Sequence, residues 1–392
     1  MVSAHRSKRF PAALLAALAI WVGANLSEAA ATTASAPCGT PAAAEDWPTG
    51  APGDVGLDAA RLCALGEMLD TSPDINVHAV LVVRHGKLVY ETYRSGVDER
   101  WGWPAGVVAH TPQMKHDLRS VSKSVTSLLV GIALDRKLIG DVDQPVFAFF
   151  PDLAALRTPE KDRITLRNLL TMASGLAWNE DRPYDRPAND DSRMNYSTNP
   201  YRFTLEKPVS EKPGAKWNYS GGDTQLLAGV LQRRTGKFIG DFAKEALFEP
   251  LGIRDFEWVK MPGNGETAAA SGLRLRPRDM AKIGELVLRR GLWNGRRVIS
   301  QGWIDESTRT YMRNFDSFAS IGYGYQWWTD YEEKGGRRSS WIYAVGLGGQ
   351  RIYIHPEFDL VVVITAGFYA EDRQDFLPYD IFDKYVIAAI RP

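Results

Sequence analysis

Cysteine is scarce in this chain of 392 residues, since only Cys38 and Cys63 occur and both lie near the N-terminus. Two thiols cannot supply the four ligands of a structural zinc site. Neither cysteine lies among the polar motifs described below, so the sequence does not favour thiol catalysis. In an oxidising compartment the pair would form a disulfide between an N-terminal arm and the first helix, and two unrelated thiols are the alternative.

The chain also lacks an excess of charge of either sign, because 47 Lys and Arg residues balance 47 Asp and Glu residues. Proteins that bind nucleic acids usually carry a basic surface, so we expect no nucleic-acid partner. With 12 Trp and 15 Tyr, the composition is that of a globular protein with an aromatic-rich interior or pocket.

Long apolar runs are equally scarce, and the one at the N-terminus has the features of a secretory signal peptide. A basic HRSKR segment is followed by the apolar run FPAALLAALAIWVGA and by the small residues SEAAATTASA. Cleavage sites that fit are Ala29, Ala31 and Ala36. A membrane anchor is the alternative, but the run is short and contains Pro11. We therefore expect residues 1–36 to be a signal peptide, the mature protein to be periplasmic or secreted, and no stable membrane span to remain.

Strand patterns occur at the two ends of the chain. After an arm at residues 37–56 and a helix with Asp58 in its first turn, two β-branched and aromatic runs flank His85-Gly86 and predict a hairpin. Near the C-terminus, a helix at about 375–389 follows four strand-like runs. Those runs are GYGYQWW, SSWIYAVGLGG, QRIYIHPEF and DLVVVITAG. Short turns between adjacent strands predict an antiparallel sheet.

The fold class that we expect is α/β in the α+β sense: an antiparallel sheet flanked by helices, with an inserted and mostly helical subdomain. Residues 57–115 and 275–392 would build the sheet, and residues 116–274 the helical subdomain. Within that subdomain, the polar and aromatic segment 178–213 is long for a loop without secondary structure. We expect it to cover a cleft as a lid.

The stretch DLRSVSKSVT places Ser120 and Lys123 three residues apart at the start of an apolar helix. Positions i and i+3 share a helix face, so the hydroxyl and the amine can meet. Burial near Val125 and Leu128 would favour a neutral amine that can take a proton. Free N–H groups at the helix N-terminus could hold an oxyanion. An N-cap serine and a surface lysine are the alternatives.

Two later segments supply further candidates. Tyr219 lies in a glycine-rich turn before a helix, and its hydroxyl could project into a cleft and serve as a proton carrier if neighbouring cations lower its pKa. A half-buried packing tyrosine is the alternative. Gly346, Gly348 and Gly349 interrupt a strand pattern, which indicates a bulge or the close approach of another backbone. That approach could be a substrate lying along an edge strand, and a kink in the sheet is the alternative.

The order of these motifs resembles the serine β-lactamase and penicillin-binding protein superfamily, in which S-x-x-K precedes a Tyr-Ser-x segment and a glycine-rich strand. Over roughly residues 45–390 the chain is similar to the class C-like hydrolases grouped with 6-aminohexanoate-dimer hydrolase and related carboxylesterases. The resemblance implies a β-lactamase/transpeptidase-like fold and an acyl-enzyme mechanism that needs neither a metal nor an organic cofactor.

The resemblance also implies roles for individual residues. Ser120 would be the acylated nucleophile, Lys123 the partner that shares its proton, and Tyr219 the second proton carrier. Backbone N–H groups of Ser120 and Leu347 would form the oxyanion hole. The candidate substrate-binding residues are Gly346, Gly348, Trp178, Tyr184 and Trp328. For each aromatic residue, packing at the subdomain interface is the alternative.

Two positions depart from the pattern of β-lactam-hydrolysing members. Gly221 stands where Tyr-x-Asn would place asparagine, and Ala344-Val345-Gly346 stands in place of a Lys-Thr-Gly triplet. The groups that would hold a β-lactam's amide and carboxylate are therefore missing. We expect a hydrolase that cleaves ester or amide bonds of small molecules. A D-alanyl peptidase, a β-lactamase and a binding or sensor module without turnover are the alternatives.

Histidine is also scarce, with six residues. A Ser-His-Asp hydrolase would use His116, but the chain has no G-x-S-x-G elbow, and His116 with Asp117 is explained by its place before a helix. The other five histidines show no metal-ligand spacing. His85 and His355 are predicted to lie in surface turns, so we expect no metal site.

Overall fold

The computed structural model describes residues 38–41, 47–184, 186–313 and 320–391. The predicted signal peptide, residues 1–36, lies outside these ranges. Within them, none of the helices has the length and apolar character needed to cross a membrane.

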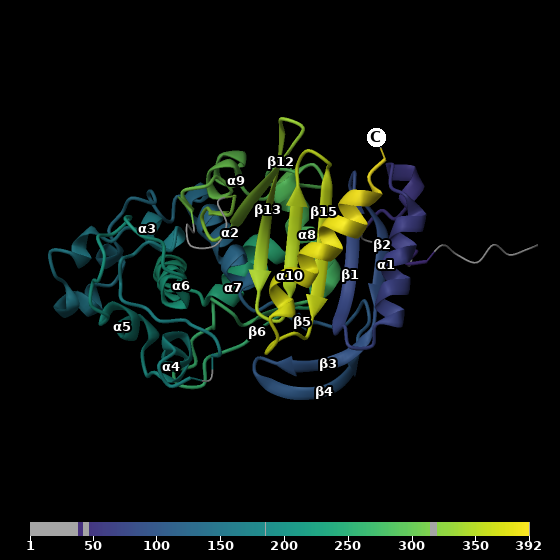
Figure 1. The fold of residues 1–392 in the computed structure, drawn as a ribbon. Helices are drawn as coiled ribbons and strands as arrows, with labels where there is room; N and C mark the ends of the chain where they lie inside the picture. The colour runs from purple at the N-terminus through teal and green to yellow at the C-terminus, as the bar shows by residue number, and fades with distance from the viewer. Residues whose placement is uncertain (1–37, 42–46, 185, 314–319, 392) are drawn as a thin grey trace, which may run out of the picture. The chain divides into compact units, whose positions relative to one another are not determined.

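The described residues form an antiparallel sheet of eight strands in the order β10-β11-β12-β13-β14-β15-β1-β2 (Figure 1). These strands are β1 (Val77–Arg84), β2 (Lys87–Tyr93), β10 (Met312–Arg313), β11 (Gly322–Tyr323), β12 (Trp328–Lys334), β13 (Arg337–Gly346), β14 (Gln350–His355) and β15 (Leu360–Ala366). β1 pairs with β15, with Val77 opposite Ala366 and Arg84 opposite Leu360. The two ends of the chain therefore share one sheet, which confirms the predicted fold class.

Helices cover both faces of this sheet (Figure 1). Leu81 and Val83 of β1 pack in one apolar cluster with α2 (Val121–Asp135) and α8 (Pro277–Leu288). Val80 and Val82 face the other way and pack with α1 (Ala59–Thr71) and the C-terminal helical turns. All eight residues of β1 are buried because side chains alternate between two covered faces.

Helices predominate between the two groups of strands. They are α2, α3 (Leu166–Leu170), α4 (Asp190–Tyr196), α5 (Pro200–Leu205), α6 (Gly221–Thr235) and α7 (Ile239–Ala243), and α9 (Gln301–Ser307) and α10 (Arg373–Asp380) follow later in the chain. Short 3-10 or π turns occupy Pro52–Val55, Val146–Phe149, Pro151–Leu156, Lys161–Arg163, Lys244–Phe248, Ile381–Val386 and Ile387–Ala389.

The helical part and the sheet share one apolar core. Leu128 of α2, Leu227 of α6 and Ile352 of β14 belong to the same cluster of buried residues. The described residues accordingly form a single compact unit. The segment 178–213 contains α4 and α5, so it is a partly helical segment rather than a loop without secondary structure.

Short strands complete the fold. A hairpin of β3 (Ser95–Arg100) and β4 (Trp103–Ala109) stands apart from the large sheet, and β5 (His116–Asp117), β7 (Leu273–Leu275) and β6 (Glu257–Trp258) form a small sheet in that order. β8 (Leu292–Trp293) pairs with β9 (Arg296–Arg297). β5 matters for the site because only two residues separate it from Ser120.

Cys38 and Cys63 are joined by a disulfide, with their Cα atoms 5.4 Å apart. Cys63 lies within α1, so the bond ties the N-terminal arm to that helix. Asp58 is the N-cap of α1 rather than a member of its first turn, because its carboxylate accepts a hydrogen bond from the Ala60 N–H at 2.9 Å.

Candidate active site

Ser120 immediately precedes α2, and its hydroxyl does not cap the helix. Instead, Lys123 Nζ lies 3.1 Å from Ser120 Oγ, as the i, i+3 spacing predicts. The residue before the serine, Arg119, has φ = 49°, a left-handed conformation that is costly for a residue with a Cβ. Ion pairs of the Arg119 side chain with Glu99 and Asp117 help to hold it there.

The second serine of the motif, Ser122, has a structural role. Its hydroxyl donates a hydrogen bond to the Arg119 carbonyl at 2.6 Å and accepts one from the Leu273 N–H at 3.1 Å. Both bonds are buried, and they link the start of α2 to β7. Ser122 therefore cannot serve as the nucleophile without breaking this link.

Lys123 is buried, with 2 % of its surface exposed. Its Nζ donates to the Ala270 carbonyl at 3.2 Å, lies 3.7 Å from Glu180 Oε1, and sits 4.6 Å from the centre of the Tyr219 ring. Burial alone would lower the pKa of Lys123, but Tyr219, Glu180 and Asp191 together raise the pKa above its ordinary value. The expectation of a neutral amine is therefore wrong for this resting state, because acidic neighbours outweigh burial.

Tyr219 precedes α6, which is capped by Ser220 through a 3.0 Å hydrogen bond from the Asp223 N–H. The Tyr219 ring lies beside Lys123, and Ser120 and Lys123 both favour the ionised form of its hydroxyl. Burial raises the pKa of Tyr219, and the opposing effect of Lys123 does not restore it to the ordinary value. The condition that cations lower this pKa is therefore not met, and Tyr219 is a neutral phenol at neutral pH.

Two acidic residues beside Lys123 were not predicted from the sequence. Glu180 accepts hydrogen bonds from Trp178 Nε1 at 2.8 Å and from the Tyr184 hydroxyl at 3.2 Å. Asp191, in α4, is buried, and its pKa is raised to about 7 by burial and by the charge of Glu180, against the opposing effect of Lys123. Both residues belong to the segment 178–213, so that segment sets the charge around Lys123.

Ser120 and Lys123 open into a cleft of ≈ 2130 Å³. Part of its wall is formed by residues of the segment 178–213, among them Glu180, Asp191 and Asn195. The role of this segment as a lid stays a prediction. Tyr184 and Leu347 also line the cleft.

The other predicted substrate-binding residues have packing roles in this structure. Trp178 is 6 % exposed and packs against Phe203 at a ring separation of 6.1 Å. Trp328 stacks on Tyr219 at 6.3 Å and contacts Trp217 at 5.6 Å. The Trp328 contacts support the position of the Tyr219 ring, and neither Trp178 nor Trp328 is among the residues that line this cleft.

The glycines on either side of Leu347 permit close contacts within the protein. A Cβ at Gly346 would lie 2.2 Å from the Leu118 carbonyl oxygen, and one at Gly348 would lie 2.6 Å from Tyr369 ring atoms. β13 pairs with β12 only as far as Tyr343, and Gly346 pairs only with Gln350 of β14, so one edge of the strand has no strand partner at Gly346 among the described residues. The close approach is that of the backbone leading to Ser120, and it brings Leu347 to the cleft.

Comparisons with known proteins agree with this architecture. Residues 67–382 match the model of the Beta-lactamase family. The 6-aminohexanoate-dimer hydrolase of Paenarthrobacter ureafaciens is 27% identical over 321 residues, which cover 78% of this chain and 75% of the relative. Esterase EstB of Burkholderia gladioli is 27% identical over 213 residues, or 51% of this chain and 52% of the esterase.

Solved structures show the same fold. A Bacillus anthracis protein provisionally assigned as a 6-aminohexanoate-dimer hydrolase superposes with a TM-score of 0.67 at 23% identity, covering 83% of this chain and 81% of that one. The octameric penicillin-binding protein homologue of Pyrococcus abyssi gives a TM-score of 0.64 at 18% identity, with coverage of 86% and 78%. The family match extends over most of the chain and includes the S-x-x-K helix. The chain therefore belongs to the Beta-lactamase family and is a serine hydrolase.

Proposed function

We propose that this protein hydrolyses ester or amide bonds of small molecules through an acyl-enzyme on Ser120. The observation that carries the proposal is the 3.1 Å contact between Lys123 Nζ and Ser120 Oγ in an open cleft, with the Tyr219 ring beside Lys123 Nζ. A nucleophile within hydrogen-bonding reach of its proton acceptors is the arrangement that covalent catalysis requires.

The proposed first step forms a bond between Ser120 Oγ and the carbonyl carbon of the substrate. The proton of the hydroxyl passes to the Lys123 and Tyr219 pair, after that pair has lost one proton. Because Glu180 and Asp191 favour the charged form of Lys123, the competent state is a Tyr219 phenolate beside the Lys123 ammonium. Backbone N–H groups of Ser120 and Leu347 would hold the oxyanion.

The second half of the reaction returns the proton. Tyr219 would donate it to the leaving alcohol or amine as the carbonyl bond to that group breaks. Water then attacks the acyl-enzyme, with the same pair accepting its proton, and Ser120 recovers its hydrogen when the acid product leaves.

The substrate class follows from what faces this centre. Ala344 is the first residue of the triplet that replaces Lys-Thr-Gly, and it is fully buried. Because its side chain is a methyl group, β13 offers no cation at that position. We infer that the substrates are small esters or amides that need no carboxylate anchor on this strand. The names of the two curated relatives, an amide-type dimer hydrolase and an esterase, fit this range.

We also propose that the enzyme is exported. The N-terminal leader pattern and the Cys38–Cys63 disulfide support this proposal, since disulfides form and persist in oxidising compartments. Fractionation of the native host, with an antibody against the mature chain, tests it. Cytoplasmic protein of full length would contradict it.

The nucleophile is tested by intact-mass spectrometry after treatment with a fluorophosphonate. We expect one adduct on the wild type and none on Ser120→Ala. The control is Ser95→Ala, which alters an exposed serine of β3 and should leave labelling unchanged. An adduct on Ser120→Ala would overturn the assignment.

Turnover is tested with p-nitrophenyl butyrate. We expect a burst of about one equivalent followed by a steady rate, because acylation and deacylation are separate steps. A burst without a steady rate would favour a sensor. Release of D-alanine from a D-Ala-D-Ala peptide at a higher kcat/KM than that for the ester would favour a D-alanyl peptidase.

A further inference from the structure

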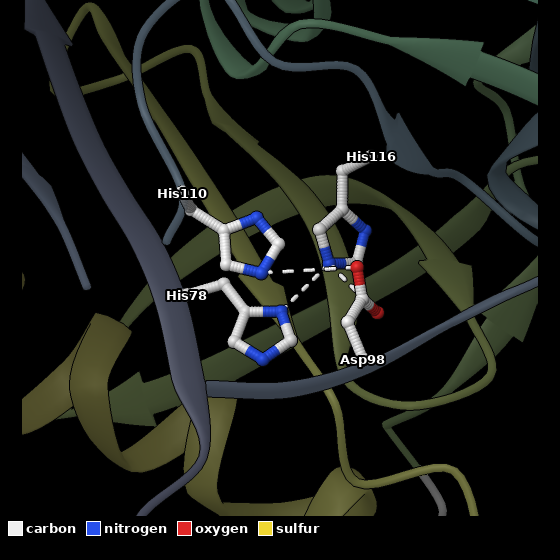
Figure 2. A group of neighbouring side chains, drawn as sticks. All are labelled: His78, Asp98, His110 and His116. Carbon is white, nitrogen blue, oxygen red and sulfur yellow. Dashed lines mark hydrogen bonds and ion pairs between the residues drawn. The ribbon is translucent and has the colours of Figure 1, made fainter. Parts of the chain in front are cut away.

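Three histidines and one aspartate meet at a buried point outside the catalytic centre (Figure 2). His78 comes from β1, Asp98 from β3, His110 from the residue after β4, and His116 from β5. One nitrogen of each imidazole and one carboxylate oxygen all lie within 4.8 Å of one another. Four segments of the chain thus direct potential metal ligands to one place.

Hydrogen bonds at the outer side of two imidazoles fix which nitrogen carries the proton. His116 Nδ1 lies 3.0 Å from the Asp117 carbonyl, which can only accept, so this nitrogen is the donor. His78 Nε2 lies 3.0 Å from Asn76 Oδ1, and Asn76 in turn donates through Nδ2 to the Val97 carbonyl at 2.8 Å. The inner nitrogens, His116 Nε2 and His78 Nδ1, therefore both present lone pairs.

These two lone pairs face each other across 2.8 Å. Two acceptors at that distance repel unless a proton or a cation lies between them. The third imidazole also lacks a partner, because His110 Nε2 is buried and has no hydrogen-bond partner among the described residues. It lies 3.7 Å from Asp98 Oδ2, and His116 Nε2 lies 3.7 Å from Asp98 Oδ1.

We propose that this cluster is a metal site that binds a single divalent transition-metal ion, with Zn²⁺ as the ion that fits best. Neutral imidazole nitrogens and carboxylate oxygens are ordinary Zn²⁺ ligands. In a tetrahedral site with metal–nitrogen bonds of about 2 Å, ligand atoms are separated by about 3.3 Å. The observed separations of 2.8 and 3.7 Å bracket that value.

The surroundings match those of a protein metal centre. Each outer hydrogen bond, from His116 to a backbone carbonyl and from His78 to a side-chain amide, orients a ligand in the way that outer-sphere partners do. Asp98 also accepts a 2.8 Å hydrogen bond from the Tyr369 hydroxyl.

The site is suited to a structural rather than a catalytic ion. The protein supplies four ligands, which fills a tetrahedral shell and leaves no position for a substrate or water. His116 is four residues before Ser120, and β5 continues into the strained Arg119. An ion at the cluster would therefore fix the backbone that presents the nucleophile to the cleft.

The experiment measures metal content and spectra of the purified protein. After growth with added ZnCl2 and removal of loosely bound metal, elemental analysis should find about one Zn²⁺ per chain. Replacement by CoCl2 should give the visible absorption bands of tetrahedral Co²⁺. A chelator should lower the thermal midpoint, and ZnCl2 should restore it.

Variants distinguish binding at this site from nonspecific metal binding elsewhere on the protein. His110→Ala and Asp98→Asn should each lower the affinity for Zn²⁺ by about tenfold or more. His85→Ala is the control, because His85 is an exposed histidine in the β1–β2 turn and should leave metal content unchanged. Wild type without stoichiometric metal, or equal affinity in wild type and His110→Ala, would overturn the proposal. The Co²⁺ spectrum of the wild type provides a test that does not depend on a variant folding.

Discussion

The protonation state of the Lys123 and Tyr219 pair predicts how activity depends on pH. Both pKa values are raised, so the pair must lose a proton that it still holds at neutral pH before it can act as a base. We therefore expect kcat/KM for p-nitrophenyl butyrate to rise with pH, by up to about tenfold per unit between about pH 7 and about pH 9. Initial rates corrected for spontaneous hydrolysis measure this. A profile that is flat or falls over that range would contradict the assignment.

Glu180 gives a second test of the protonation of the Lys123 and Tyr219 pair. Glu180→Gln keeps acceptor and donor groups for Trp178 and Tyr184 but removes the negative charge 3.7 Å from Lys123 Nζ. Loss of that charge should lower the pKa of Tyr219, whose proton must leave to give the competent state, and move the alkaline rise of kcat/KM down by about one pH unit.

The matched control for this charge removal is Glu206→Gln. Glu206 follows α5 in the same segment and pairs with Arg202 at 3.2 Å on the surface. Its removal should leave the pH profile in place. A shift of equal size in both variants would mean that net charge, rather than the carboxylate beside Lys123, sets the profile.

At the level of single residues, the sequence could predict contacts within one helix and not contacts across the fold. Ser120 and Lys123 meet because their spacing on a helix is fixed by backbone geometry. Glu180 and Asp191 reach Lys123 only through the path of the segment 178–213. For that reason the sequence could not give the sign of the Lys123 pKa shift.

At the level of elements, periodicity decided which strands were predictable. β1 and β2 are rich in β-branched and aromatic residues around His85-Gly86, and the hairpin is present as expected. β4 is exposed along nearly its whole length, so it has no alternation of apolar and polar residues to detect. His355, predicted in a surface turn, ends β14 and is 2 % exposed, because Phe358 and Trp341 stack against it.

The contact between β13 and the start of α2 predicts the effect of a single methyl group. In Gly346→Ala the new Cβ would lie 2.2 Å from the Leu118 carbonyl oxygen, so β13 must move away from the backbone that leads to Ser120. We expect a loss of about 1–3 kcal/mol in the free energy of unfolding. We also expect kcat to fall by about tenfold or more, because Leu347 moves with the strand.

Gly302→Ala provides the comparison for that substitution. Gly302 lies in α9, and a Cβ there would meet nothing within 4 Å. Denaturant unfolding and ester turnover should both stay near wild-type values or improve slightly, since alanine favours helix. Equal losses of stability and turnover in the two variants would contradict the proposed importance of the close contact between Gly346 and Leu118.

At the level of the whole molecule, the class of fold was predictable and the meeting of distant side chains was not. Strand patterns at both ends of the chain indicated a shared sheet, and β1 does pair with β15. The positions of His78, Asp98, His110 and His116 follow no metal-binding spacing along the chain. Only the path of β1, β3, β4 and β5 brings them together.

The Cys38–Cys63 disulfide should stabilise the chain as a whole by restricting its unfolded state. The bond closes a loop with a sequence separation of 25 residues, for which chain entropy gives about 3.5 kcal/mol. We expect the double variant Cys38→Ser, Cys63→Ser to unfold at lower urea concentration while keeping its kcat, since neither residue lies at the cleft. Wild type in a reducing agent should behave like the variant, and unfolding midpoints that do not differ would contradict the prediction.

The pairing of Val77 with Ala366 also affects the order of events during synthesis. β1 and β2 leave the ribosome early, but the neighbour that completes the pairing of β1 is made near the end of translation. Because such distant pairings form late, the nascent chain remains without its central sheet for most of its synthesis. A chain that stays unfolded until it is nearly finished is suited to the export that we propose, because a secretion channel accepts unfolded chains.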